Sequence, residues 1–406
     1  MAALTPGSIL ATLPSELDAV AVRAGDRIVV AVEPDEKVAT SGAAAFDRLD
    51  ALTPGWWAGF ISYDLGRAVE RVAPRRAADA EAPPDLVLAR FTTRAVLDPA
   101  TGEVDIVGHG PARSRLETAL QARPDPAQVG PAALHWRSSL HRAEFEAGVE
   151  QIVGLIQAGD CYQVNLTRRL TCPTPLDPVG LFAELQRRNP APYAALLRFD
   201  DLSVVSASPE CFLRWRGRDV TTQPIKGTGT DPGALRASAK DRAENVMIVD
   251  LARNDLGRVC EPGSIGVPSL CVVEAHPGLH HLVSTVQGRL REAVGVGGLL
   301  RATLPPASVT GAPKPRVLQI IEDLEPVRRG VYCGAVGWID TERDAGELAV
   351  AIRTFTVTGE ATQLGVGAGI VADSRPDAEW AETELKAARL LAAAGRRDLL
   401  AAALAS

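Results

Sequence analysis

Short runs of alternating hydrophobic and polar residues dominate the first third of the chain. Three of them are RIVVAVE at 27–33, DLVLARF at 85–91 and GEVDIVG at 102–108, and Pro, Gly and Asp residues separate them. This pattern is typical of β-strands joined by turns. A charged Ala/Pro/Arg stretch at 73–84 predicts a surface loop, and the Pro-containing segment 121–133 predicts a connector.

Helical spacing appears after this connector, mixed with further strands. The segment 138–160 carries hydrophobic residues at helical intervals, with Ser138 or Ser139 as a plausible N-cap. Strands are predicted at 161–170, 194–199 and 202–208, with a short helix at 181–189. A clear helix follows Ser374, which is expected to cap it, with Asp377 completing a capping box. The absence of a repeat or heptad argues against solenoids and coiled coils.

Composition narrows the class of partner. The chain has 406 residues, with 43 Lys+Arg against 50 Asp+Glu and a net charge of −7. Because the cationic residues form no cluster, we expect no nucleic acid and no membrane as partner, and a small-molecule substrate fits better. No hydrophobic run approaches the roughly 18 residues of a membrane span. The six cysteines form no C-x-x-C pair, so we expect them to be reduced and mostly buried in a cytoplasmic protein.

Lysine is rare in this chain, since almost all cationic residues are arginine. A lysine retained against that bias is a candidate for chemistry that a guanidinium cannot perform, such as nucleophilic attack by a neutral amine, although chance retention explains any one of them equally well. The lysines are Lys37, Lys226, Lys240, Lys314 and Lys386.

Two helical segments carry paired carboxylates. Asp241 and Glu244 lie three residues apart in 241–257, and Glu379, Glu382 and Lys386 follow a similar spacing in the C-terminal helix. Residues at these intervals share one helix face, so two acidic faces could meet across a cleft and hold Mg²⁺ together with substrate oxygens. On spacing alone, two solvated helix faces remain the simpler interpretation.

Three further segments are candidates for a reaction centre. Glu210 follows a proline at the end of a hydrophobic strand, where burial would raise its pKa into the range of a general acid, unless it is an ordinary exposed loop carboxylate. Lys226 precedes a Gly-rich turn, where a lysine is usually solvated. GVGAGIV at 365–371 has glycines at alternate positions, which suits close approach of backbone N–H groups to an anion. One of His280 and His281 is expected to face inward from a strand.

In this order, the segments resemble the chorismate-utilising enzymes. The segments concerned are SASPE, PIKGT, DRAENVMIVDLARNDLGRVC, HHLVSTVQG, SVTGAPK, GVYCGAVGWID, IRTF, GAGIVADS and EWAETELK, which cover about 140–390. The resemblance implies an α+β fold, with two large, mainly antiparallel sheets packed as a sandwich, helices outside and the active site in a central cleft. Residues 1–133 would contribute strands to that sandwich, and 134–406 would form the chorismate-binding catalytic region of one intertwined unit.

Within this family, two features resemble the branch that converts chorismate and ammonia to 4-amino-4-deoxychorismate for folate synthesis. Lys226 stands where the anthranilate and isochorismate branches carry a small residue, and GWWAGFISYDLGRAVER at 55–71 is similar to a segment of the aminating branch. Gln163 replaces the water-activating lysine of the isochorismate and salicylate synthases. The anthranilate-forming branch and a non-catalytic chorismate-binding scaffold remain the alternatives.

The resemblance also implies a role for each matched residue. Glu210 would protonate the departing C4 hydroxyl while Lys226 attacks C2, and ammonia would then add at C4 and expel the lysine. His281 matches the active-site histidine of the family. Mg²⁺ would bind Glu244 and Glu382, with Asp241 and Glu379 nearby. The implied contacts to chorismate are Gly227, Thr228, Tyr332, Arg353, Gly367, Ala368, Gly369 and Lys386.

Ammonia needs a source, and nothing in the chain resembles a glutaminase with its Cys, His and Glu. A separate glutamine amidotransferase subunit is therefore implied as a partner. The segment LPSELDAV at 13–20 is only loosely similar to the tryptophan-feedback segment of the anthranilate branch.

Overall fold

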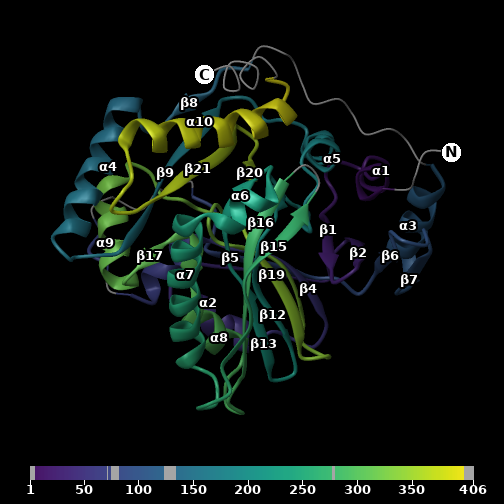
Figure 1. Cartoon of the computed structure of the whole chain (residues 1–406). Helices are drawn as coiled ribbons and strands as arrows, with labels where there is room; N and C mark the ends of the chain where they lie inside the picture. The colour runs from purple at the N-terminus through teal and green to yellow at the C-terminus, as the bar shows by residue number, and fades with distance from the viewer. Residues whose placement is uncertain (1–4, 71, 75–81, 123–133, 277–278, 397–406) are drawn as a thin grey trace.

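Two antiparallel sheets form the centre of the molecule in the computed structural model, which describes residues 5–70, 72–74, 82–122, 134–276 and 279–396 (Figure 1). The first sheet has the strand order β17-β9-β21-β20-β11-β10-β1-β2-β6-β7, and β8 pairs with β9. Its strands are β1 (Ala19–Ala24), β2 (Arg27–Val32), β6 (Arg94–Leu97), β7 (Val104–Val107), β8 (Arg137–Ser138), β9 (Gln163–Cys172), β10 (Tyr193–Phe199), β11 (Leu202–Ser208), β17 (Gly311–Ala312), β20 (Thr354–Val357) and β21 (Thr362–Ile370).

The second sheet has the order β14-β16-β13-β12-β19-β18-β4-β5-β3, and β15 pairs with β16. Its strands are β3 (Glu36–Thr40), β4 (Trp56–Ile61), β5 (Leu86–Arg90), β12 (Cys211–Arg216), β13 (Asp219–Gln223), β14 (Ile225–Gly229), β15 (Gly266–His276), β16 (Leu279–Arg289), β18 (Ala335–Asp340) and β19 (Ala345–Val350).

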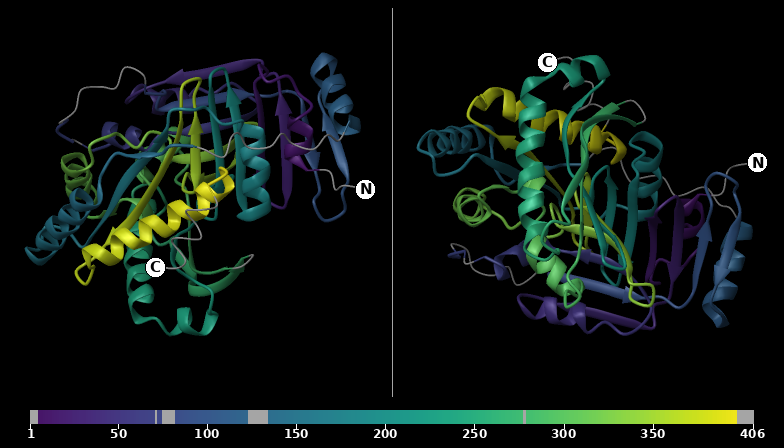
Figure 2. Two further views of the ribbon diagram at one scale, coloured as in Figure 1. Left: turned by 90° about the horizontal axis from the view of Figure 1, so that it is seen from above. Right: turned by 60° about the horizontal axis from the view of Figure 1, so that its bottom comes forward.

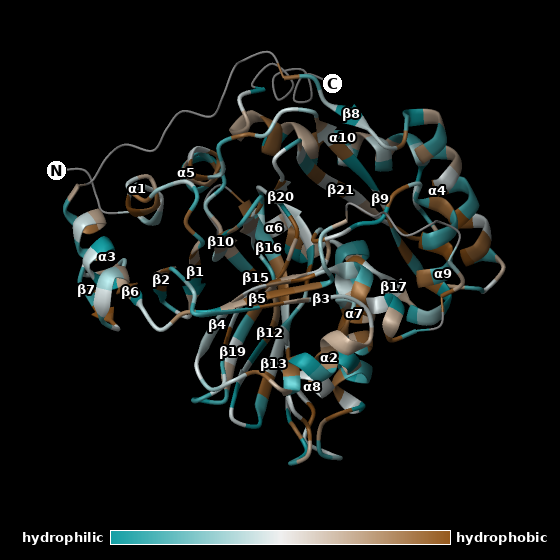
Figure 3. Cartoon of the chain, turned by 180° about the vertical axis from the view of Figure 1, so that it is seen from behind, coloured by the Kyte–Doolittle hydropathy of each residue, from teal (hydrophilic) through white to brown (hydrophobic). Residues whose placement is uncertain are grey.

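Helices cover the outer faces of both sheets. They are α1 (Pro6–Leu10), α2 (Ala44–Asp50), α3 (Gly110–Ala122), α4 (Arg142–Gln157), α5 (Pro178–Arg188), α6 (Pro232–Ala237), α7 (Ala239–Gly257), α8 (Val296–Thr303), α9 (Lys314–Leu324) and α10 (Pro376–Ala393), with 3₁₀ turns η1 (Tyr63–Ala68) and η2 (Ala307–Val309). Helix α10 crosses β21 and β9 (Figure 1). In Figure 3 the bands of hydrophobic and hydrophilic residues alternate along α4, as expected of an amphipathic helix. Among the described residues, no helix is both long and hydrophobic enough to cross a membrane.

Strands from the first 133 residues enter both sheets. β1 pairs with β10, and β4 pairs with β18, so early and late segments of the chain lie side by side (Figure 2). Hydrophobic residues of the two inner faces, such as Val20, Phe60 and Leu197, pack together between the sheets. This arrangement confirms the predicted α+β sandwich with outer helices.

Two predicted helix caps are wrong. Helix α4 begins after His141, whose N–H donates to Glu144, whereas the hydroxyl of Ser139 accepts the N–H of Arg169 in β9. Helix α10 begins after Arg375, and Ser374 donates to Glu379 instead of capping the helix. Ser139 takes a partner from another part of the structure, and Ser374 bonds a side chain of its own helix, so neither hydroxyl caps the helix that spacing predicted.

Candidate active site

Glu210 lies in the connection from β11 to β12 and is buried, with 4% of its surface exposed. Its backbone is fixed on both sides, because its N–H donates to Ser208 Oγ and its carbonyl accepts the N–H of Val350. Burial raises the pKa of its carboxyl to about 7, while the hydroxyl of Ser308 and the charge of Lys226 oppose the rise. The interpretation as an exposed loop carboxylate is therefore wrong, and Glu210 can hold a proton near neutral pH.

Lys226 projects from β14 toward this carboxyl and the two acidic helix faces. Its Nζ lies 4.0 Å from Glu244 Oε2, which is an ion pair without hydrogen-bond contact. Burial lowers the pKa of Lys226, the carboxylates of Glu244 and Glu210 oppose this, and the positive charge of Lys386 reinforces it. The sequence left open which influence prevails, and in the structure burial does. A larger fraction of this amine is therefore neutral than in water.

The alternating glycines of β21 bring backbone close to Lys226. A Cβ on Gly369 would lie 3.0 Å from Lys226 Nζ and 3.3 Å from Gln163 Nε2, and one on Gly367 would lie 2.7 Å from Thr167 Cγ2. The side chain of Ala368 points to the opposite face, into the hydrophobic core. Because β20 pairs with β21 only from Thr362 to Leu364, the next part of that edge is not paired by a described strand. Lys386 Nζ donates to the Gly367 carbonyl there.

The predicted acidic faces of α7 and α10 do meet. Burial is the main cause that raises the pKa of Glu244, and the negative charge of Glu382 raises it further. Burial would raise the pKa of Glu382, but the positive charge of Lys386 keeps it below its ordinary value. Lys386 Nζ lies 2.6 Å from Glu382 Oε1. Glu379 is buried and accepts from Ser374 Oγ at 2.7 Å. The two faces are thus close enough to interact, although the side chains of Glu382 and Lys386 remain half-exposed.

Asp241, at the start of α7, is placed beside the β14 turn by a glycine. Gly227 has a left-handed φ of 80°, and a Cβ there would lie 2.9 Å from that of Asp241. One residue further along β14, Thr228 Oγ1 lies 2.8 Å from His281 Nδ1 of β16. His281 is 1% exposed, so it is the inward-facing histidine of the pair. Gly227, Thr228 and His281 thus form one edge of the same centre.

Arg353 and Tyr332 are the more distant members of the predicted set. Arg353 adopts a left-handed φ of 52°, and burial lowers its pKa to about 10, reinforced by Arg389 and opposed by Glu210. Tyr332 packs its ring on Gly365, where a Cβ would lie 2.1 Å from Cδ1 of the ring. Burial raises the pKa of Tyr332 well above its ordinary value, so it is a neutral phenol that can donate a hydrogen bond.

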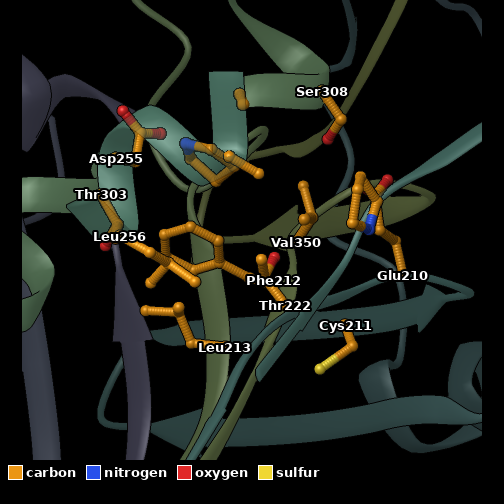
Figure 4. A pocket seen from close by; sticks show the side chains of 14 residues that line it. Glu210, Cys211, Phe212, Leu213, Thr222, Asp255, Leu256, Thr303, Ser308 and Val350 are labelled. Atoms are coloured by element: carbon orange, nitrogen blue, oxygen red, sulfur yellow. The ribbon is translucent and has the colours of Figure 1, made fainter. Parts of the chain in front are cut away.

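Ser308 is a member of the site that sequence reasoning did not single out. Its side chain hydrogen-bonds Glu210 and lowers the pKa of that carboxyl, opposing burial. The signal lay in SVTGAPK, which carries the resemblance without an assigned role. Ser308 and Glu210 line a cavity of about 20 Å³, room for about one water, whose opposite side carries Asp255 and Thr303 (Figure 4).

Comparison with known proteins agrees with this arrangement. The family described as chorismate binding enzyme matches residues 16–392. The chain is 42% identical, over 82% of its length and 76% of the relative, to "Aminodeoxychorismate synthase component 1" of Klebsiella aerogenes. It is 36% identical, over 82% of its length and 72% of the relative, to "Anthranilate synthase component 1" of Neisseria meningitidis serogroup B. The crystal structure of anthranilate synthase component I from Streptococcus pneumoniae TIGR4 covers 91% of this chain and 92% of its own, with a TM-score of 0.78 and 27% identity.

The chain therefore belongs to the chorismate-binding enzymes, as the family match and several relatives of this identity and coverage show. The fold expected from the resemblance is confirmed by the same structural likeness.

Proposed function

We propose that this enzyme aminates chorismate at C4 with ammonia, forming 4-amino-4-deoxychorismate for 4-aminobenzoate and folate synthesis. The observation that carries the proposal is Lys226, a largely buried amine that interacts with the charge of Glu210 and whose Nζ lies 4.0 Å from Glu244 Oε2. Relatives that are 37–42% identical over 82% of the chain are named aminodeoxychorismate synthase component 1, which supports the same reaction.

The proposed chemistry uses two side chains in sequence. The neutral amine of Lys226 forms a bond to C2, both double bonds of the ring diene shift by one position, and the C4–O bond breaks as Glu210 gives its proton to the leaving hydroxyl, which departs as water. Ammonia then bonds to C4, both double bonds return to their original positions, and the Lys226–C2 bond breaks. Glu210 with a pKa of about 7 and Lys226 with a lowered pKa suit these roles at neutral pH.

The remaining matched residues would bind and orient chorismate. The guanidinium of Arg353, the phenol of Tyr332, the ammonium of Lys386 and the backbone of Gly367, Ala368 and Gly369 would contact its carboxylates. The unpaired edge of β21 supports this, because N–H groups on such an edge can bind an anion. Gly227, Thr228 and His281 would line the other wall, with His281 held by Thr228.

Mg²⁺ is the proposed cofactor, held by Glu244 and Glu382 with Asp241 and Glu379 near them. The donor set fits, because it consists of carboxylate oxygens close enough for Glu382 to raise the pKa of Glu244. When bound, the metal would supply positive charge that fixes the ring carboxylate of chorismate.

A glutamine amidotransferase subunit is the proposed source of ammonia, and "component 1" in the names of the relatives supports a second component. We place the reaction in the cytoplasm, because all six cysteines are buried and unpaired and a reducing compartment suits them.

The test is to incubate the purified chain with chorismate, Mg²⁺ and ammonium salt, and to identify the product before and after adding an aminodeoxychorismate lyase. We expect 4-aminobenzoate only with the lyase, and loss of amination in Lys226→Ala. Formation of anthranilate and pyruvate without the lyase would assign the chain to tryptophan synthesis instead. An absence of Mg²⁺-dependent turnover would favour a scaffold subunit.

A further inference from the structure

The segment 62–67, SYDLGR, is part of the sequence signature at 55–71 but supplies no residue to the reaction centre. It consists of Ser62, which follows β4, and most of η1, and in space it meets Gly330, more than 260 residues away in the chain. The Ser62 hydroxyl and the Tyr63 N–H both donate to the Gly330 carbonyl at 2.9 Å. The Gly330 N–H donates to Asp64 Oδ2 at 2.7 Å. The peptide groups on both sides of this glycine are therefore held by one short segment.

Two more contacts join the same segment to the residues just before Gly330. The guanidinium of Arg329 lies 4.3 Å over the ring of Tyr63, a favourable cation–π distance. Arg67 forms an ion pair with Glu322 near the end of α9. Residues 62–67 thus contact the connection from α9 to β18 at Arg329 and Gly330, and the end of α9 at Glu322.

This connection carries Tyr332. Gly330 has a left-handed φ of 61°, which sets the direction of the chain two residues before the tyrosine. On the other side, the Cys333 N–H donates to the Ala351 carbonyl at 2.9 Å. The Tyr332 ring then lies on Gly365 of β21. Tyr332 is held between two backbone anchors, and Gly330 is the one that depends on Asp64 and Ser62.

We propose that Asp64 and Ser62 are positioning residues that set Tyr332 for chorismate through Gly330. This rests on the proposed function, because that proposal gives Tyr332 its contact with the substrate. Burial raises the pKa of Asp64 to about 6, and the hydrogen bond from the Gly330 N–H opposes this rise. The carboxylate is therefore mostly ionised at neutral pH and accepts a charge-assisted hydrogen bond. Removing this acceptor leaves the Gly330 N–H without a partner and lets the connection shift.

The experiment measures chorismate binding by calorimetry, with Mg²⁺ and without ammonia, for Asp64→Ala and Asp64→Asn in a Lys226→Met background that cannot form a covalent adduct, and measures KM and kcat in the Lys226 protein. We expect Asp64→Ala to weaken binding roughly tenfold, in line with one lost charge-assisted hydrogen bond, and to raise KM while kcat changes little. Asp64→Asn keeps an acceptor and should restore most of the affinity. Where Asp64→Ala does not fold, Ser62→Ala should weaken binding in the same direction by a smaller factor.

Asp50→Ala is the matched control, since Asp50 Oδ1 accepts the Gly297 N–H at 2.7 Å, a similar long-range bond on the outer side of the second sheet. Its affinity for chorismate should equal that of the wild type. In a Tyr332→Phe background, Asp64→Ala should cause no further loss, because its effect passes through the tyrosine.

Three results would overturn the proposal: wild-type affinity in Asp64→Ala, an equal loss in Asp50→Ala, or independent losses from Asp64→Ala and Tyr332→Phe. These are distinct from a failure of the proposed function, which would show as chorismate binding without amination by the wild-type protein.

Discussion

Lys314 and Lys226, two lysines whose pKa is lowered by burial, differ in how completely they are paired. Lys314 Nζ lies 2.6 Å from Asp255 Oδ2 and 2.7 Å from the Thr303 carbonyl. Lys226 Nζ has its nearest carboxylate at 4.0 Å. Burial lowers the pKa of both amines, and the nearby carboxylates Asp255 and Glu244 oppose it. One lysine is thus satisfied by hydrogen bonds, whereas the Nζ of the other lies beyond hydrogen-bond distance of Glu244.

The surroundings of Lys226 and Lys314 can be compared directly because one carboxyl from each lines the same cavity. Glu210 and Asp255 line opposite sides of one small cavity, and burial raises the pKa of both carboxyls, to about 7 and about 6. Burial alone therefore does not define a reactive site. What separates the two is that Asp255 is hydrogen-bonded to its lysine, whereas Glu210 hydrogen-bonds Ser308 and interacts with Lys226 through charge.

The largest expected effect is that of Lys226→Met on turnover. Loss of the nucleophile should reduce the rate of amination by about 10⁴-fold or more, which is the usual order of magnitude when a nucleophile that attacks the substrate is removed. The folded state should be retained, because Lys226 makes no short hydrogen-bonded ion pair. Steady-state kinetics and a melting curve check both parts, and near-normal amination would remove Lys226 from the mechanism.

Lys314→Met should have the opposite profile. Removing one partner of a buried ion pair leaves the Asp255 carboxyl buried and unpaired, which costs about 3 to 5 kcal/mol in the free energy of unfolding. The turnover of the remaining folded protein should stay close to that of the wild type. Chemical denaturation measures the loss, and the double variant Lys314→Met/Asp255→Leu should recover most of it. A catalytic loss as deep as that of Lys226→Met would contradict the distinction.

Glu210→Gln should lower kcat by about 10²- to 10⁴-fold, the usual contribution of a general acid. The pH profile gives a second test. Because the acid form is active and its pKa is raised to about 7, the wild-type activity should fall as pH rises through about 7, and this limb should be missing in Glu210→Gln. The lowered pKa of Lys226 should produce a limb of opposite sign, with activity rising as the amine loses its proton.

The smallest effect is expected for Gly369→Ala. The new Cβ would lie 3.0 Å from Lys226 Nζ, so the amine must shift by a few tenths of an ångström. A roughly tenfold loss of kcat is expected from such a displacement. Gly154→Ala in α4 is the control, because its Cβ would meet nothing within 4 Å, and it should leave the kinetics unchanged.

Sequence reasoning reached the residues whose signal is local or carried by family motifs. The helix spacing of Asp241, Glu244, Glu379 and Glu382 predicted shared faces, and the resemblance placed them across one site, as the structure does. Sequence reasoning could not predict how far Lys226 is buried or how burial changes the pKa of Lys226, since both depend on strands far apart in the chain. It also missed Ser308 and the contact of Asp64 with Gly330, because long-range hydrogen bonds leave no spacing pattern. The predicted cap at Ser139 failed for the same reason, because its hydroxyl accepts the N–H of Arg169 in β9.

The most direct test of the account is to look for the covalent bond between Lys226 and the substrate. The protein is mixed with chorismate and Mg²⁺ without ammonia, quenched, digested and analysed by peptide mass spectrometry. The account predicts that the Lys226 peptide gains the mass of chorismate less one water, that ammonium discharges this adduct as aminated product, and that the Lys314 peptide is unmodified. Normal amination with an unmodified Lys226 peptide at every quench time, together with an active Lys226→Met variant, would contradict it.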